Sequence, residues 1–121
     1  MDYFDWINQA LIPPFVRFTQ EAMHKGYYYD LGLAEGAARH SKHLMEAWSM
    51  GHAPPHLLDG AVENVIQALS IGCNYEDTLK WAAYALTEDE EHYANLRDNN
   101  RLGVGIALRN NVMFITQRLK R

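Results

Sequence analysis

Apolar residues recur at alternating steps of three and four between residues 30 and 50, which is the periodicity of one face of an α-helix. Asp30 precedes this stretch as an N-cap, and Gly51 follows it as a stop signal. The first half of the stripe, from Ala34 to Ser41, consists of small residues, so a neighbouring element can approach it closely. We therefore expect a central helix over residues 30–50.

The N-terminal segment has the same periodicity but contains two consecutive prolines. Asp2 is placed to cap a first short helix. Pro13 and Pro14 are expected to interrupt this helix, because proline lacks the N–H group that the helix interior needs, and a second helical segment restarts there and ends near Gly26. The sequence thus predicts a split or kinked helix.

Helical spacing continues through the second half of the chain. It predicts a third helix over residues 55–72, a fourth helix capped by Asn74, and a fifth helix that begins at the capping box of Thr87 and Glu90. The fifth helix is expected to run nearly continuously from Glu88 to Leu119, with a bend near Gly103 as the alternative. No strand is expected, because the run GVGIAL is short and has no clean alternation of polar and apolar residues.

Composition and charge extend this interpretation. The chain has 121 residues, 48% of them hydrophobic, which suits one soluble domain. The predicted fold class is all-α: a single compact bundle of about five helices over residues 1–121, with a long C-terminal helix. The net charge of −4 is uneven, because residues 1–96 hold 14 acids and 5 Lys or Arg, and residues 97–121 hold 1 acid and 6 Lys or Arg. The basic end is expected to meet an acidic surface.

The location predicted from the sequence is the cytoplasm. No apolar run approaches the roughly 20 residues that span a bilayer. The N-terminal sequence MDYFDW is acidic and aromatic, unlike the basic start of a secretory signal. The single cysteine, Cys73, fits a reducing compartment and is expected to be a small apolar residue near a helix start.

Histidines in the central helix are the first candidates for metal ligands. His40 and His43 are three residues apart and could grip one metal ion together with Glu46. The alternative is a solvated helix face, on which Glu35 pairs with Arg39 at the i,i+4 spacing. The alternative is favoured, since His43 and Glu46 point away from the apolar stripe.

A second pair of motifs resembles half of a di-metal carboxylate site. Glu21 and His24 are spaced i,i+3, as are Asp89 and His92, and di-metal helical bundles use such pairs. Surface charge near helix ends explains all four residues equally well. No motif for phosphate binding or for a nucleophile is present. We therefore predict no catalytic residue, no cofactor and no metal, and lean against an enzyme.

The basic C-terminal segment is the predicted binding surface. Arg97 and Arg101 share one side of the expected helix with apolar residues, whereas Arg109 and Arg118 point away from it. Arginines are placed in this way when their aliphatic stems cover apolar surface and their charges reach an acidic neighbour. The predicted partner-binding residues are Arg97, Arg101, Val104, Leu108, Val112 and Ile115.

Together these observations favour a small acidic helical interaction module, an adaptor or inhibitor that regulates a host or phage complex by surface docking. The expected partner is another protein, including a second copy in a homodimer. The first alternative is a metal-binding helical bundle, either an enzyme or a carrier. The second is a nucleic-acid-binding subunit, which is less favoured because such proteins are normally more basic. No membrane association is expected.

Overall fold

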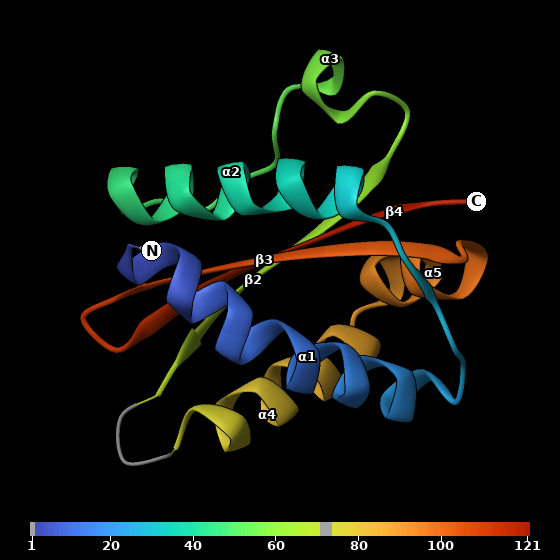
Figure 1. Cartoon of the computed structure of the whole chain (residues 1–121). Coiled ribbons are helices and arrows are strands. Elements are labelled where there is room, and N and C mark those ends of the chain that lie inside the picture. Colours follow the sequence, from blue (N-terminus) through green and yellow to red (C-terminus); the bar gives the residue numbers. More distant parts are fainter. Residues whose placement is uncertain (1, 71–73) are drawn as a thin grey trace.

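A computed structural model describes residues 2–70 and 74–121 and combines helices with a four-stranded sheet (Figure 1). The predicted all-α bundle is therefore wrong, and the fold class is α+β. The elements along the chain are α1 (Tyr3–Met23), β1 (Tyr28–Tyr29), α2 (Leu31–Ala47), α3 (Pro55–Leu58), β2 (Val62–Leu69), α4 (Tyr75–Glu88), α5 (Glu90–Asp98), β3 (Arg101–Arg109) and β4 (Val112–Lys120).

The sheet has the strand order β1-β3-β4-β2, in which β1 pairs parallel with β3 and the other pairs are antiparallel. β3 and β4 form a hairpin across Asn110 and Asn111, whose φ angles are 50° and 63°. Two successive residues with positive φ are typical of a type I′ turn, and asparagine tolerates this conformation better than most residues. Figure 1 shows α2 on one face of the sheet and α1 with α4 on the other.

Helices cover both faces of the sheet, and this explains why the strands show no alternation of polar and apolar residues in the sequence. In β4, the seven residues 113–119 are all buried. A strand that is buried on both faces reads as a continuous apolar run, without the alternation that marks a strand with one wet face. Residues 101–120 therefore form a hairpin, not the predicted last helix, and residues 62–69 form β2, not the predicted third helix.

Gly103 and Gly105 allow α2 to lie directly on β3. A Cβ atom on Gly103 would collide with the backbone of Ala34, and one on Gly105 would collide with the backbone of Ala38. The predicted close approach of a neighbour to the small residues of the central helix is confirmed, and that neighbour is a strand. Glycine is poor for a helix but serves here as the contact surface between two layers.

The helix ends are predicted better than the helix interiors. The side chains of Asp2, Asp30 and Asn74 accept hydrogen bonds at the starts of α1, α2 and α4, as expected. α1 is continuous through Pro13 and Pro14, so the predicted interruption is wrong. α1 ends at His24, α5 is capped by Asp89 instead of Thr87, and the predicted position of Cys73 lies outside the described residues.

The outer edge of β3 is closed by the two-residue strand β1 and, beyond it, by two side chains. The carbonyl of Leu102 accepts a hydrogen bond from the Asp30 backbone N–H at 2.8 Å. The Tyr29 hydroxyl lies 3.3 Å from both the N and the O of Val104. The Asn8 side chain donates to the carbonyl of Ile106 at 2.8 Å and accepts from its N–H at 2.9 Å. Alternate residues of β3 thus find partners in α1, in β1 and in Asp30, the residue before α2.

None of the helices in the described ranges is both long enough and apolar enough to cross a bilayer.

Candidate functional site

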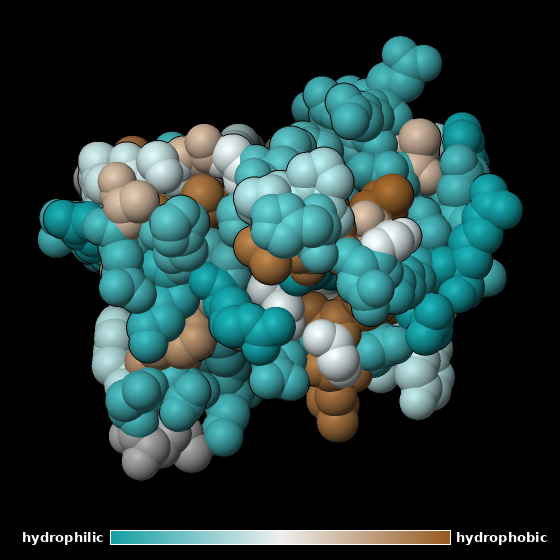
Figure 2. Space-filling model, turned by 90° about the horizontal axis from the view of Figure 1, so that it is seen from above, coloured by the Kyte–Doolittle hydropathy of each residue, from teal (hydrophilic) through white to brown (hydrophobic). Residues whose placement is uncertain are grey.

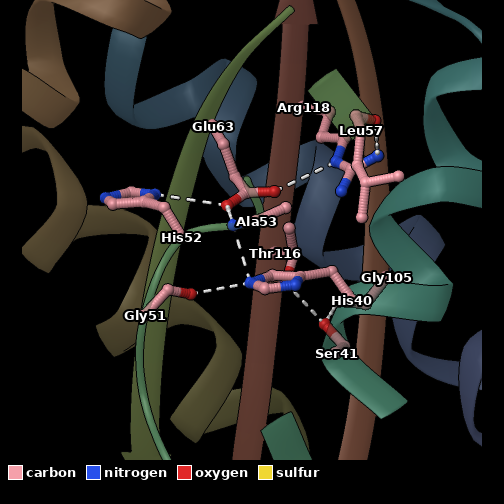
Figure 3. Close-up of polar contacts among 10 residues, drawn as sticks. All are labelled: His40, Ser41, Gly51, His52, Ala53, Leu57, Glu63, Gly105, Thr116 and Arg118. Atoms are coloured by element: carbon pink, nitrogen blue, oxygen red, sulfur yellow. Dashed lines mark hydrogen bonds and ion pairs between the residues drawn. The ribbon is translucent and has the colours of Figure 1, made fainter. Parts of the chain in front are cut away.

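A buried cluster of charged and polar groups lies where α2 faces β2 and β4 (Figure 3). Its centre is the carboxylate of Glu63 on β2, and its other members are Arg118 on β4, His40 on α2, and His52 and Ala53 in the segment between α2 and α3. We call these five residues the Glu63 cluster. Glu63 and Arg118 are direct partners across the two antiparallel strands, so their side chains leave the same face of the sheet.

The Glu63 carboxylate is surrounded by nitrogen atoms. Its Oε1 accepts from the Ala53 backbone N–H at 3.0 Å and lies 3.2 Å from His52 Nδ1 and 3.5 Å from His40 Nε2. Its Oε2 accepts from Arg118 Nε at 3.0 Å. The side chains of Glu63 and Arg118 are only 1% and 8% exposed. A buried carboxylate requires such a partner, because an unpaired charge is very costly away from water.

The Arg118 guanidinium lies close to both α2 and α3. A Cβ atom on Gly36 of α2 would collide with the Arg118 guanidinium, so glycine at this position makes room for the side chain. Arg118 Nη1 also donates to the carbonyl of Leu57 in α3 at 3.4 Å. The guanidinium therefore connects β4, β2 and α3.

The hydrogen bonds define which ring nitrogens carry hydrogen. His40 Nε2 lies 2.7 Å from the carbonyl oxygen of Gly51, which can only accept, so Nε2 is an N–H donor. His52 Nδ1 likewise donates to the Glu63 carboxylate, which leaves the opposite nitrogen, Nε2, to act as an acceptor or base. The His52 side chain is 56% exposed, so this nitrogen lies in the solvent-accessible part of the site.

A cavity of about 470 Å³ opens next to the cluster. Small and apolar residues form part of its wall, and nitrogen-bearing side chains form the rest. We call it the histidine cavity; its lining is Gly36, Arg39, His40, His43, His52, Ala53, Pro54, Leu57 and Arg118. No carboxylate is among these lining residues. Figure 2 shows the face above α2, on which small apolar patches are separated by hydrophilic side chains.

The structure distributes the predicted metal candidates over several places. His40 is buried in the Glu63 cluster, and His43 lines the histidine cavity with its ring centroid 6.4 Å from that of His40. Glu46 is exposed outside the cavity lining. The predicted surface pair of Arg39 and Glu35 forms at 3.1 Å.

The second predicted metal set lies at helix ends. His24 is the C-cap of α1, and Glu21 is exposed on its last turn. Asp89 caps α5 and lies 3.5 Å from the His92 ring. Over residues 2–70 and 74–121, no group of three or more His, Cys, Asp or Glu side chains is arranged to hold a metal ion.

The predicted partner-binding residues do not form a helical stripe. Val104 and Ile115 are fully buried in the sheet, Arg97 pairs with its neighbour Asp98, and Arg101 pairs with Asp30 at 3.2 Å. Leu108 and Val112 are partly buried in the hairpin. Partner binding by these residues stays a prediction, now without the helix on which it was based.

Sequence reasoning missed the residues that define the site. Glu63 and Arg118 were placed in helices, and their pairing depends on a strand register that the sequence pattern does not reveal. His52 lies in the segment between α2 and α3, and its spacing from Glu63 matches no known motif. One usable signal existed: Glu63 is a lone acid within an apolar run, and a buried acid needs a partner.

Comparisons with known proteins identify the fold alone. No protein-family model and no curated protein sequence matches the chain. The crystal structure of NaASP2 with Zn²⁺ is 12% identical with a TM-score of 0.67, over 90% of this chain and 78% of that one. Na-ASP-1 is 14% identical with a TM-score of 0.63, over 93% of this chain and 38% of that one.

An outer surface protein from Borrelia burgdorferi is also similar, at 15% identity with a TM-score of 0.61, over 100% of this chain and 96% of that one. These neighbours have CAP/SCP-like α/β folds. The finding contradicts the predicted helical interaction module, and with it the metal-binding bundle and the basic C-terminal helix that would bind nucleic acid.

Proposed function

We propose that this protein binds a small organic anion in the histidine cavity. The observation that carries the proposal is the composition of the lining: the Arg39 guanidinium and the His43 imidazole, which take no part in the Glu63 cluster, lie beside apolar residues and the Arg118 guanidinium, with no carboxylate among the lining residues. Convergent nitrogen donors on an apolar wall suit a ligand that has a carboxylate or phosphate group on a nonpolar body.

The charge balance around the cavity supports this ligand class. Glu63 lies behind the lining and is neutralised by Arg118 at 3.0 Å, so it does not oppose an incoming anion. Arg39 pairs only at the surface with Glu35, where both side chains are more than two-thirds exposed (70% and 75%). Such exposed pairs are weak, and the Arg39 guanidinium can therefore turn to a ligand at little cost.

The size of the cavity agrees with a small ligand. Its volume of about 470 Å³ lies within the roughly 300–1,000 Å³ of typical small-molecule sites. Ala53, Pro54 and Leu57 supply the apolar contact that would hold the nonpolar body of the ligand.

A zinc ion is named in one of the similar structures, but the Glu63 cluster as it stands does not fit one. The Glu63 oxygens already accept from three nitrogen donors of the chain, namely the Ala53 N–H, His52 and Arg118. His40 Nε2 carries a hydrogen that it donates to Gly51. A metal ligand needs a free lone pair, so the proposed function uses no zinc.

The test is a titration of the whole chain with benzoate, followed by calorimetry and NMR. We expect saturable binding, and about tenfold weaker binding by an Arg39→Gln/His43→Gln variant, since each tenfold corresponds to roughly 1.4 kcal/mol. The matched control is Arg17→Gln on α1, where the guanidinium pairs with Glu76 of α4, on the other face of the sheet. Benzamide has the same body without the charge, and equal affinity for benzamide and benzoate would refute the proposal.

One earlier expectation also remains a proposal. A second copy as partner is supported by exposed large apolar side chains such as Trp6, Leu31 and Trp81.

A further inference from the structure

The Glu63 cluster combines two histidines and one carboxylate, which is a ligand set that zinc uses in proteins. Ligand atoms about 2.0–2.1 Å from a tetrahedral zinc are about 3.3 Å from one another. Glu63 Oε1 lies 3.2 Å from His52 Nδ1 and 3.5 Å from His40 Nε2, close to that spacing. Glu63 Oε1 thus lies at a metal-like distance from each of the two ring nitrogens, although the native side chains in the described ranges are not arranged as a metal site.

Hydrogen atoms and a guanidinium occupy the places that a metal ion would need. His52 Nδ1 and the Ala53 backbone nitrogen direct N–H groups at Oε1, and Arg118 directs its Nε–H at Oε2. His40 Nε2 directs its N–H at Gly51. The positive charge that the carboxylate requires is therefore already present, on a side chain that is only 8% exposed.

We propose that Arg118 is the built-in substitute for a divalent cation at Glu63, so that the native cluster is independent of metal and loss of Arg118 opens a zinc site. This inference does not depend on the proposed anion binding. The strand register keeps Arg118 opposite Glu63, and the missing side chain of Gly36 leaves room for the guanidinium. When that positive charge is removed, the buried carboxylate is left with two imidazoles, and neutral imidazole and carboxylate are the ligand forms that bind zinc.

The substitution that tests the inference is Arg118→Met, which keeps an unbranched stem without the charge. After treatment with chelator, the whole chain is titrated with Zn²⁺ alone at neutral pH by calorimetry, and every titration is repeated in a His52→Ala background to separate the cluster from surface histidines. We expect His52-dependent zinc binding in Arg118→Met that is at least about tenfold tighter than any in the native chain.

The matched control is Arg101→Met. Arg101 also pairs with a partly buried carboxylate, that of Asp30, at 3.2 Å, but no histidine contacts that pair in the described structure. This control tests whether the loss of any arginine–carboxylate pair raises the affinity for zinc. It is expected to bind zinc no better than the native chain does.

Each result decides the matter. Zinc binding by the native chain that His52→Ala removes would overturn the inference, as would a folded Arg118→Met chain without His52-dependent binding. If Arg118→Met is unfolded without metal, circular dichroism is repeated with added Zn²⁺: recovery of the fold supports the inference, and no recovery counts against it, because zinc then does not replace the guanidinium.

Discussion

Arg118 and Glu63 form the buried ion pair on which the site depends, with side chains 8% and 1% exposed. Arg118→Ala leaves a buried carboxylate without its charge partner, and we expect a loss of about 3–5 kcal/mol in the free energy of unfolding. The double variant Arg118→Met/Glu63→Gln removes both charges and is expected to cost less than Arg118→Ala. Urea unfolding at neutral pH measures both.

The control for that experiment is a pair at the surface. Arg39 and Glu35 are 70% and 75% exposed, so Arg39→Ala is expected to change the free energy of unfolding by no more than about 1 kcal/mol. A loss as large as that of Arg118→Ala would show that burial is not the cause of the difference.

Tyr27 makes the stability of the folded protein fall at high pH. Burial, with a smaller contribution from Tyr93, raises the pKa of Tyr27 from 10.0 to about 12. Because the folded state holds the proton more tightly than the unfolded chain, the stability from this group is complete below pH 10 and is lost as the pH rises towards 12. We expect Tyr27→Phe to show a smaller loss of stability between these pH values, measured by urea unfolding at each pH.

At the scale of the elements, the sequence predicts the secondary structure correctly where one face of the element is exposed to solvent. α2 buries one stripe, so its helical period is visible in the sequence and its cap at Asp30 is correct. β4 is buried over residues 113–119, including the polar residues Thr116, Gln117 and Arg118, so its sequence carries no period of two. The Asn110–Asn111 turn was the available hint of a hairpin, since both residues tolerate positive φ.

The contact between α2 and β3 is expected to be intolerant of even a methyl group. Gly105→Ala places a Cβ atom against the backbone of Ala38, and forcing the layers apart is expected to cost about 1–3 kcal/mol or more. Gly26→Ala is the control, because a Cβ there meets nothing within 4 Å. Thermal unfolding of the two variants measures the difference, and equal melting temperatures would contradict the tight contact.

The hairpin turn makes a separate prediction. Asn111 has φ of 63°, a conformation that costs a β-branched residue about 1–2 kcal/mol. Asn111→Val is therefore expected to destabilise the protein, whereas Asn111→Gly keeps or raises its stability. Comparison of the two midpoints in urea tests the assignment of the turn.

At the scale of the whole molecule, the site is a product of topology. His40, His52, Glu63 and Arg118 come from distant parts of the chain, and only the order β1-β3-β4-β2 and the position of α2 bring them together. When no known motif is present, the sequence gives no direct indication that these four side chains come into contact. The one candidate residue that belongs to the cluster, His40, is predicted as a metal ligand because it lies three residues from His43, and the sequence does not reveal its actual partners.

Metal removal should leave the molecule unchanged. If the Glu63 cluster is held by Arg118 and backbone groups, then dialysis against EDTA is expected to leave the melting temperature and the NMR spectrum of the native chain as they were. A fall in the melting temperature that added zinc reverses would show that a metal ion contributes to the fold.

The closed edge of β3 bears on how copies of the protein behave at high concentration. Its outward-facing backbone groups at Leu102, Val104 and Ile106 are already bonded to Asp30, Tyr29 and Asn8. An unpaired strand invites another chain to extend the sheet, and natural proteins block such growth. By occupying the backbone groups of Ile106, the Asn8 side chain therefore prevents a strand of another copy from pairing with β3 at this position.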